Sequence, residues 1–261
     1  MCAHERSSWP NDADAVAIYE TLLVASSRSM PSTWPVHEAR LRRGAQHLGI
    51  DVPDSTMLTE AIADACVAAT LPNGCHWWRV RLDLGLAKSP GTDELHSVLE
   101  VRARPALSRI RPPAKLRIGP RIRNAADPTA GVKKTAVGPD MLAASQARQA
   151  GFDDVLLLDV RGYISEASTS AVLLGMKDGD LMTPGASTAA LPSTTVALLR
   201  ERGRLKINDC EMVVAQLADV RWACLLNAVC GCRPVHQIAE YVLEQPPAEI
   251  ISLARRLVDD A

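Results

Sequence analysis

The sequence has 261 residues, of which 47% are hydrophobic and 23% are charged, so it holds enough apolar material for one large domain or two small ones. The formal net charge of −1 and the few aromatic residues (one Phe, three Tyr, five Trp) argue against nucleic acid or an anionic membrane surface as a partner. No long apolar run occurs, and residues 1–15 lack the apolar segment of a signal peptide, so we expect a cytoplasmic protein.

The seven cysteines predict neither a disulfide framework nor a metal site. They are odd in number and scattered, no pair has the CxxC spacing, and Cys230 and Cys232 are too close together for the usual zinc motif. In a cytoplasmic chain we expect them to be reduced, with several buried as packing residues. No metal is therefore expected.

The first part of the chain predicts a small α+β domain. Residues 16–24 (VAIYETLLV) are rich in β-branched and aromatic residues, as is typical of a strand. Residues 37–50 (HEARLRRGAQHLGI) place apolar residues on one helical stripe, and Gly49 is a stop signal. Beyond them the pattern predicts a helix at 56–69 and, after a Pro-Asn-Gly turn, strands at 77–86 and 98–107.

The rest of the chain predicts a second, larger α+β domain. Residues 108–131 carry four prolines and predict a connector followed by a first strand. Asp178-Gly179 marks a hairpin within a run of short strands. The other expected elements are a helix at 139–150, a strand at 155–159, a helix at 193–202, strand–helix–strand–strand up to 238, and an amphipathic helix at 246–258. The predicted domains are 1–110 and 118–261, with a linker at about 111–117.

Missing motifs narrow the candidate functions. The sequence has no GxxxxGK[ST], no GxGxxG on a predicted strand and no HExxH, so nucleotide-binding and zinc-protease functions lose their main support. GxSxG, the nucleophile elbow of many hydrolases, is also absent.

Several motifs follow one another in a definite order. They are YETLLV at 19–24, HEARL at 37–41, the lysine pair 133–134, GYISEASTS at 162–170, LMTP at 181–184, ALPSTT at 190–195 and LLNAVCGCRPV at 225–235. Together they resemble the class IV aminotransferase family, the fold-type-IV pyridoxal 5'-phosphate enzymes, over about residues 16–238. The resemblance implies a two-domain α+β fold, the cofactor in the cleft between the domains, and a homodimer. One such motif would be a weak signal, whereas several in order are specific.

The lysine pair offers a candidate for the amine that forms a Schiff base with the cofactor's aldehyde. Paired lysines are usually solvent-facing, and this remains the interpretation for Lys134. The family spacing, counted back from Ala150-Gly151, implies that Lys133 is the Schiff-base lysine. In an extended chain adjacent side chains point to opposite faces, so only one of the two can enter the site.

The resemblance assigns Glu166 and Arg40 to opposite ends of the cofactor. A carboxylate at Glu166 would keep the pyridine nitrogen protonated and make the ring an electron sink. The alternative is a surface glutamate beside a turn. The planar fork of Arg40 is implied to hold two phosphate oxygens, although composition alone would leave this arginine solvated.

Further residues are implied to bind the cofactor. Thr194 and Thr195 lie at a predicted helix start, where free backbone N–H groups favour an anion, and N-capping by Ser193 is compatible with that role. The resemblance also assigns three residues outside this helix: Thr169, Asn227 and Ala228. A strand-end asparagine is otherwise more often a turn former.

The family includes transaminases and 4-amino-4-deoxychorismate lyase, and three features favour the lyase. All members share aldimine exchange and proton abstraction by the released lysine, here Lys133. The lyase then eliminates pyruvate and leaves 4-aminobenzoate, whereas a branched-chain or D-amino-acid transaminase reprotonates the cofactor. Asn227-Ala228 is similar to the lyase signature, Thr21 matches a catalytic threonine of lyases, and Gly138 stands where many transaminases carry a tyrosine.

Other positions depart from the family pattern and leave the substrate open. Leu23, Leu84 and Val196 replace arginines, and Ala136 and Ala171 replace asparagines. Since a charge-assisted hydrogen bond contributes about 1.5–3 kcal/mol, these changes should weaken binding of dianionic substrates.

Two hypotheses therefore remain. Arg79, Arg81 or Arg109 could replace the missing arginines in an enzyme acting on a small-molecule amino substrate, or the chain could be a degenerate, non-catalytic family member. Retention of Lys133 together with a carboxylate and an arginine for the cofactor favours the enzyme.

Overall fold

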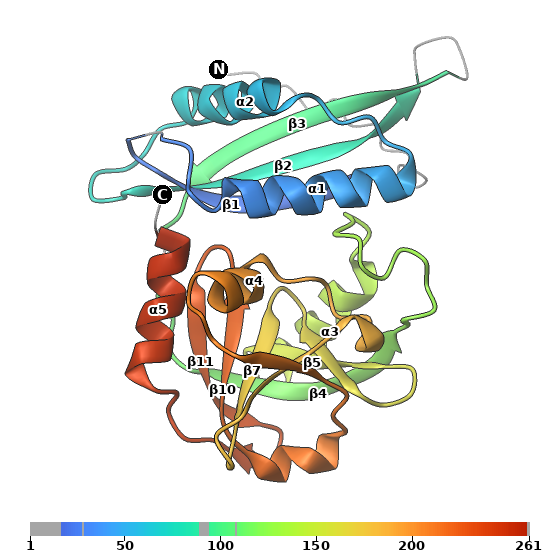
Figure 1. Ribbon diagram of the computed structural model, residues 1–261, viewed down its shortest axis with the longest axis vertical. Helices are drawn as coiled ribbons and strands as arrows, with labels where there is room; N and C mark the ends of the chain where they lie inside the picture. Colours follow the sequence, from blue (N-terminus) through green and yellow to red (C-terminus); the bar gives the residue numbers. More distant parts are fainter. Residues whose placement is uncertain (1–16, 28, 89–93, 108, 260–261) are drawn as a thin grey trace.

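The computed structural model describes residues 17–27, 29–88, 94–107 and 109–259, which form two sheets with helices packed against them (Figure 1). The smaller sheet is antiparallel, in the order β1-β2-β3, and the larger one has nine strands. None of the described helices is both long and apolar enough to cross a membrane.

The smaller sheet consists of β1 (Ala17–Ala25), β2 (Trp77–Lys88) and β3 (Leu95–Pro105), with α1 (Trp34–Leu48) and α2 (Ser55–Ala68) on it. Alternate residues of β1 face these helices, because Ile18, Leu22 and Val24 belong to one core with buried residues of both. Gly49 ends α1 in the left-handed conformation (φ 66°), as the sequence predicts.

The larger sheet has the order β6-β5-β4-β11-β10-β7-β8-β9, with β12 paired to β11. Its strands are β4 (Ala114–Arg123), β5 (Asp154–Asp159), β6 (Ile164–Ala167), β7 (Ala171–Met176), β8 (Leu181–Pro184), β9 (Ile207–Cys210), β10 (Val220–Asn227), β11 (Gly231–Ile238) and β12 (Tyr241–Val242). Its helices are α3 (Gly138–Gln149), α4 (Thr194–Glu201), α5 (Ala248–Asp259) and the short 3-10 turns Ala186–Thr188 and Val214–Asp219.

Both faces of the larger sheet are buried. Val172 and Leu174 of β7 face the inner core of the sheet, whereas Leu173 between them packs under α4 and α5. In the same way, Leu156 of β5 faces inward and Leu157 packs under α3. Near-continuous apolar runs such as DVLLLD therefore have a core on each side.

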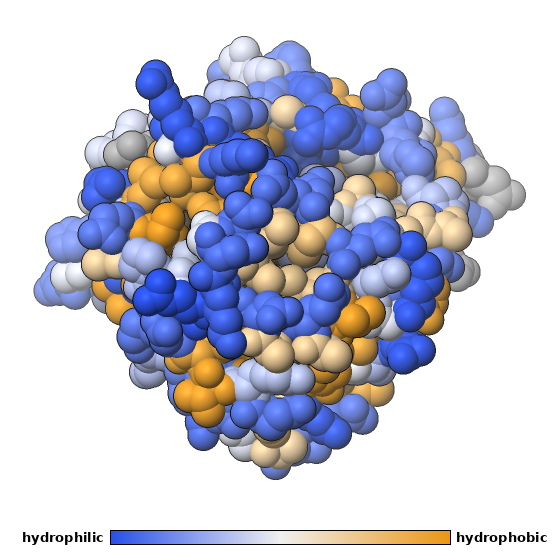
Figure 2. All heavy atoms as spheres, turned by 60° about the horizontal axis from the view of Figure 1, so that its bottom comes forward, coloured by the Kyte–Doolittle hydropathy of each residue, from blue (hydrophilic) through white to orange (hydrophobic). Residues whose placement is uncertain are grey.

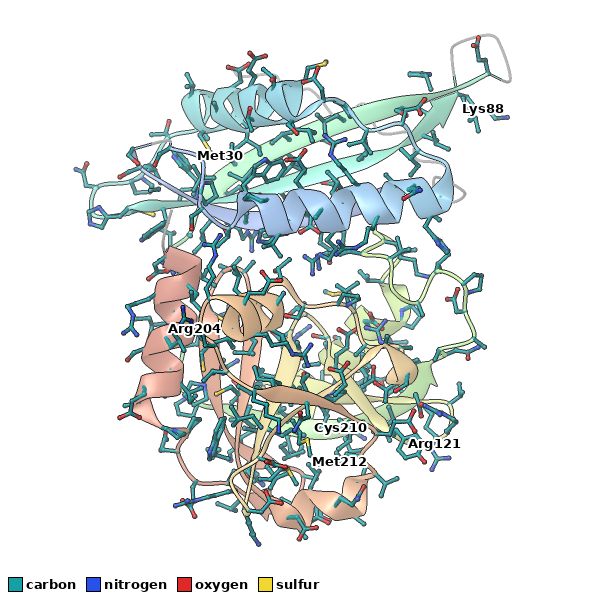
Figure 3. All side chains as sticks on the ribbon, viewed as in Figure 1. Met30, Lys88, Arg121, Arg204, Cys210 and Met212 are labelled. Atoms are coloured by element: carbon teal, nitrogen blue, oxygen red, sulfur yellow. The ribbon has the colours of Figure 1, made fainter. Side chains whose placement is uncertain are left out.

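Two of the side chains labelled in Figure 3 belong to separate cores. Met30 lies beside the smaller sheet and packs on its core, whereas Met212 is buried in the core of the larger sheet. Hydrophilic residues cover most of the face that Figure 2 brings forward, and the hydrophobic residues visible there form small separate patches.

The predicted α+β class is confirmed. The predicted elements appear in the expected order, and the Asp178-Gly179 turn joins β7 to β8. β4 begins at Ala114, inside the segment 111–117 that the sequence assigns to a linker. The domain limits 1–110 and 118–261 remain predictions.

A short segment after β4 returns to the smaller sheet. The N–H of Tyr19 donates to the carbonyl of Lys133, and the N–H of Thr135 donates to the carbonyl of Ala17, both at 2.8 Å. Val132 is buried in the core of the smaller sheet. The backbone of the lysine pair is therefore fixed to the edge of β1.

Candidate active site

A cavity of about 930 Å³ is lined by residues of both sheets. Its lining includes more bases than acids. The basic residues are Arg40, Arg79, Arg81, Arg111, Arg123, Lys133, Lys134, Arg148 and Arg233, and the acidic ones are Asp127, Asp140, Asp153, Asp154 and Glu166. With all of these ionised, the lining carries four more positive than negative charges, which favours an anionic ligand.

The two lysines have different surroundings, although both line the cavity. The Nζ atom of Lys133 lies 4.3 Å from the centre of the Tyr19 ring, and no carboxylate pairs with it among the described residues. Lys134 is held by Asp127, at 3.3 Å, and by the Thr129 hydroxyl. An ion-paired amine is the poorer nucleophile, so the geometry favours Lys133 as the reactive one.

Arg40 is anchored by a carboxylate that the sequence did not point to. Its Nε and Nη2 donate to the two oxygens of Glu20 at 2.6 and 2.7 Å, and Nη1 donates to the carbonyl of Pro192 at 2.9 Å. Burial alone would raise the pKa of Glu20, but Arg40 and the His37 ring, 2.8 Å away, lower it to about 2. Three of the five guanidinium N–H groups are used, which leaves two for a ligand in the cavity.

Glu166 lies in β6 with only 7% of its surface exposed. Its Oε1 is 2.8 Å from Nη2 of Arg123, and its Oε2 accepts from the N–H of Leu191 at 3.3 Å. Burial raises the pKa of Glu166, and Arg123 only partly offsets this effect. Each oxygen keeps a further lone pair, so Glu166 can still accept a hydrogen bond from a ring N–H.

The start of α4 offers an anion site on the cavity wall. Ser193 is the N-cap, and its hydroxyl accepts from the N–H of Val196. The N–H groups of Thr194 and Thr195 have no acceptor among the described residues, as is usual for the first turn of a helix. Thr194 lines the cavity, whereas Thr195 does not. The Thr195 hydroxyl is buried and has no hydrogen-bond partner in the part of the chain that the structure describes.

Asn227 lines the cavity, and its side chain also shapes a turn. Its Oδ1 accepts from the N–H groups of Val229 and Cys230, both at 2.9 Å, and its Nδ2 donates to the Ser170 hydroxyl. This side chain is the turn former that a strand-end asparagine suggests. The turn brings Ala228 to the cavity wall.

Thr21 and Thr169 also line the cavity. Thr21 lies in β1, two residues from Tyr19, and so points to the same face as the ring beside Lys133. Thr169 is exposed in the bend between β6 and β7. Of the predicted site residues, only Thr195 lies outside the lining.

The positions that differ from the family pattern fall into two groups. Leu23, Leu84 and Val196 are buried. Ala136 and Ala171 line the cavity.

The three arginines that could replace the missing family arginines differ in their position relative to the cavity. Arg79 and Arg81 line the cavity, whereas Arg109 does not. The Arg109 guanidinium binds Asp259 and the carbonyl of Val229 and lies over the ring of Trp77. Arg109 is therefore not a replacement for a substrate-binding arginine.

The sequence missed Glu20, Arg123 and Asp140. Glu20 stands within the YETLLV motif, on the same face of β1 as the apolar residues that pack against the helices. A carboxylate at such a position is a signal of a buried charge with a partner, and the sequence offered it. Arg123 and Asp140 lie in different elements and meet only in the fold, so no local pattern marked them.

The donor set fits pyridoxal 5'-phosphate. The cavity lining holds an amine that has no ion pair among the described residues, and a buried carboxylate on β6. Free N–H groups at α4, together with the remaining N–H groups of Arg40, suit a phosphate. Among the described residues, no three His, Cys, Asp or Glu side chains are grouped to hold a metal ion.

Comparisons with known proteins find relatives across most of the chain. The family model described as amino-transferase class IV matches residues 17–238. A proposed 4-amino-4-deoxychorismate lyase from Legionella pneumophila superposes with a TM-score of 0.81 at 20% identity, covering 94% of this chain and 91% of that one. The pyridoxal-phosphate-bound form of a hypothetical aminotransferase from Mycobacterium tuberculosis superposes with a TM-score of 0.76 at 23% identity, covering 97% and 94%. At these identities, the two structures share the fold.

A curated relative matches over a shorter segment. The branched-chain-amino-acid aminotransferase of Escherichia coli K12 is 40% identical over 67 residues, which is 24% of this chain. The matched segment spans only 21% of that relative's length.

Proposed function

Because the chain belongs to the class IV aminotransferase family, whose members depend on pyridoxal 5'-phosphate, we propose that it is a lyase resembling 4-amino-4-deoxychorismate lyase, forming 4-aminobenzoate and pyruvate. The observation that carries the proposal is the convergence of Lys133, Glu166 and Arg40 on one cavity. A degenerate family member would be expected to have lost at least one of them. This convergence favours a catalytic protein.

The residues around the cavity have separate roles in this proposal. Lys133 binds the cofactor and, once released, moves a proton at the amino-bearing carbon of the substrate. Glu166 holds the pyridine nitrogen, and the outer edge of Arg40 with the first turn of α4 holds the phosphate. When bound, the cofactor supplies the electron sink that makes this proton acidic.

Two arginines of the cavity lining suit a substrate with more than one negative charge. Arg79 and Arg111 both line the cavity, are exposed and have no hydrogen-bond or ion-pair partner among the described residues. Arginine without a partner can bind a carboxylate with two parallel hydrogen bonds. A dicarboxylate such as 4-amino-4-deoxychorismate would use both, in place of the family arginines missing at Leu23, Leu84 and Val196.

Two further features favour the lyase over a transaminase. Thr21 points to the same face as the ring beside Lys133, where it can exchange a proton with the leaving part of the substrate. Gly138 is exposed and stands where many transaminases carry a tyrosine, so the contact that this tyrosine makes with the cofactor is missing here.

Amino transfer is the second candidate function. The similarity to a branched-chain-amino-acid aminotransferase over 67 residues supports it. Activity toward branched-chain or D-amino acids would distinguish it from the lyase. We also propose a homodimer, as the family resemblance implies.

Absorption spectra with added cofactor test the proposal. The wild-type protein should develop a visible absorption band from cofactor bound to a lysine, Lys134→Ala should keep it, and Lys133→Ala should lose it. Release of 4-aminobenzoate, measured beside amino transfer from branched-chain and D-amino acids, then decides between the two reactions. A wild-type protein that gives no band would refute the enzyme, and loss of the band in Lys134→Ala alone would reassign the lysine.

A further inference from the structure

One arginine joins two buried carboxylates beside the cavity. Nη2 of Arg123, in β4, lies 2.8 Å from Oε1 of Glu166 and donates to Oδ2 of Asp140 at 2.9 Å. Asp140 is the third residue of α3, and only 6% of its surface is exposed. A single nitrogen therefore divides its charge between two acids from different elements.

The common explanation for an acid in the first turn of a helix does not account for Asp140. Such residues usually cap free N–H groups or interact with the helix dipole from the solvent side. No side chain of the described residues caps the start of α3 with a hydrogen bond, and Asp140 instead turns inward to Arg123. Burying a carboxylate there costs free energy that a surface position would avoid.

The titratable groups around this pair are few. Burial raises the pKa of Asp140, an effect that Arg123 and Lys134 oppose. Burial likewise raises the pKa of Glu166, with Asp140 adding to the rise and Arg123 and Lys133 opposing it. The two carboxylates thus share one guanidinium, so Arg123 neutralises the charge of only one of them.

The net charge of the cluster of Glu166, Arg123 and Asp140 explains what Asp140 contributes. A lone Glu166–Arg123 pair would be neutral, so a positively charged pyridine ring beside it would find no net counter-charge. Adding ionised Asp140 gives the cluster a net charge of −1, which matches one protonated ring nitrogen.

We propose that Asp140 is a positioning residue: by sharing Arg123, it leaves Glu166 with the negative charge that keeps the cofactor's pyridine nitrogen protonated. This role rests on the proposed function, since it requires the cofactor to bind with its ring nitrogen at Glu166. Asp140 acts through Arg123 and does not touch the ring.

The test measures the protonation of the cofactor's ring nitrogen. Each protein is loaded with pyridoxal phosphate labelled with ¹⁵N in the ring, and the nitrogen chemical shift is recorded against pH. Removing a charge this close should lower the pH at which the ring proton is lost by about one unit, a tenfold change in the proton equilibrium. Asp140→Asn should show this change, and Asp140→Glu should largely restore the wild-type curve.

Kinetics and a matched control complete the design. Asp140→Asn should lower kcat about tenfold with little change in KM, because Asp140 acts on the ring through Arg123 and not by binding the substrate. Asp153→Asn is the control: Asp153 also lines the cavity and binds an arginine at 2.7 Å, but that arginine is Arg233 and not the one at Glu166. Its nitrogen titration should match the wild type.

The outcomes separate the two proposals. Wild-type protein that binds no cofactor overturns the proposed function and this inference with it. Bound cofactor whose nitrogen titrates alike in wild type and Asp140→Asn overturns the inference alone, even if the variant is less stable. If Asp140→Asn does not fold, Asp140→Ser and Asp140→Glu provide the same comparison.

Discussion

Replacing Glu20 by Gln tests the buried anchor of Arg40. The folded-state pKa of Glu20 is about 2, compared with an ordinary value of 4.5. Since one pH unit corresponds to 1.36 kcal/mol, the ionised form contributes about 3 kcal/mol to the free energy of unfolding at neutral pH. Because the folded pKa is the lower one, this contribution is complete above pH 4.5 and disappears as the pH falls through 2.

The difference in free energy of unfolding between wild type and Glu20→Gln should become smaller as the pH falls. Urea unfolding of the cofactor-free protein, followed by tryptophan fluorescence and circular dichroism, gives the free energy of unfolding at each pH. Glu20→Gln should be much less stable than wild type at pH 7, because Arg40 is then buried without its carboxylate. By pH 3 the gap should narrow by about 2 kcal/mol, since wild-type Glu20 is by then losing its advantage.

A second variant tests whether loss of any carboxylate that pairs with an arginine of α1 has the same effect as Glu20→Gln. Glu38 pairs with Arg42 on the same helix α1, at 2.7 Å, but on the partly exposed side. Glu38→Gln should cost less than about 1 kcal/mol, with the same pH profile as wild type. Wild-type and Glu20→Gln curves that stay parallel from pH 7 to pH 3 would refute the reasoning.

Two further changes test packing and buried charge. Gly231→Ala should lower Tm by several degrees, because φ is 64° and a Cβ there would lie 2.8 Å from the carbonyl oxygen of Ala254. Gly74→Ala is the control: φ is 80° but a Cβ there would meet nothing within 4 Å, so its fall in Tm measures the cost of the backbone conformation alone. Asp154→Asn should raise Tm at pH 7 and not at pH 3, because burial raises the pKa of Asp154 and its ionised form costs stability at neutral pH. The Asn side chain keeps the oxygen that accepts from the Ser168 hydroxyl. An equal Tm of wild type and variant at pH 7 would contradict this prediction.

Much of the architecture was predictable because its signals are local. Gly49 ends α1, the Asp178-Gly179 turn closes a hairpin, and the β-branched and aromatic residues of 16–24 mark β1. The ordered motifs predicted the class IV aminotransferase family over about 16–238, and the match over 17–238 confirms it. Each of these signals is written within a few neighbouring residues.

The connections within the site were not predictable, because they join residues far apart in the sequence. Nothing local to HEARL indicates that Glu20 takes two of the Arg40 donors, or that the carbonyl of Pro192 takes a third. The meeting of Arg123 with Asp140 likewise depends on how α3 packs beside β4. Sequence motifs identified what the site contains, whereas the charge partners required the fold.

β1 has a further consequence for how this chain tolerates change in length. Adjacent residues of this one strand serve opposite sides: the Tyr19 backbone and ring hold Lys133, while Glu20 turns to the helices and holds Arg40. Inserting or deleting one residue within the strand would exchange its two faces. Both basic groups would lose their supports in one event, so we expect relatives of this protein to vary in loop lengths around β1 but not within it.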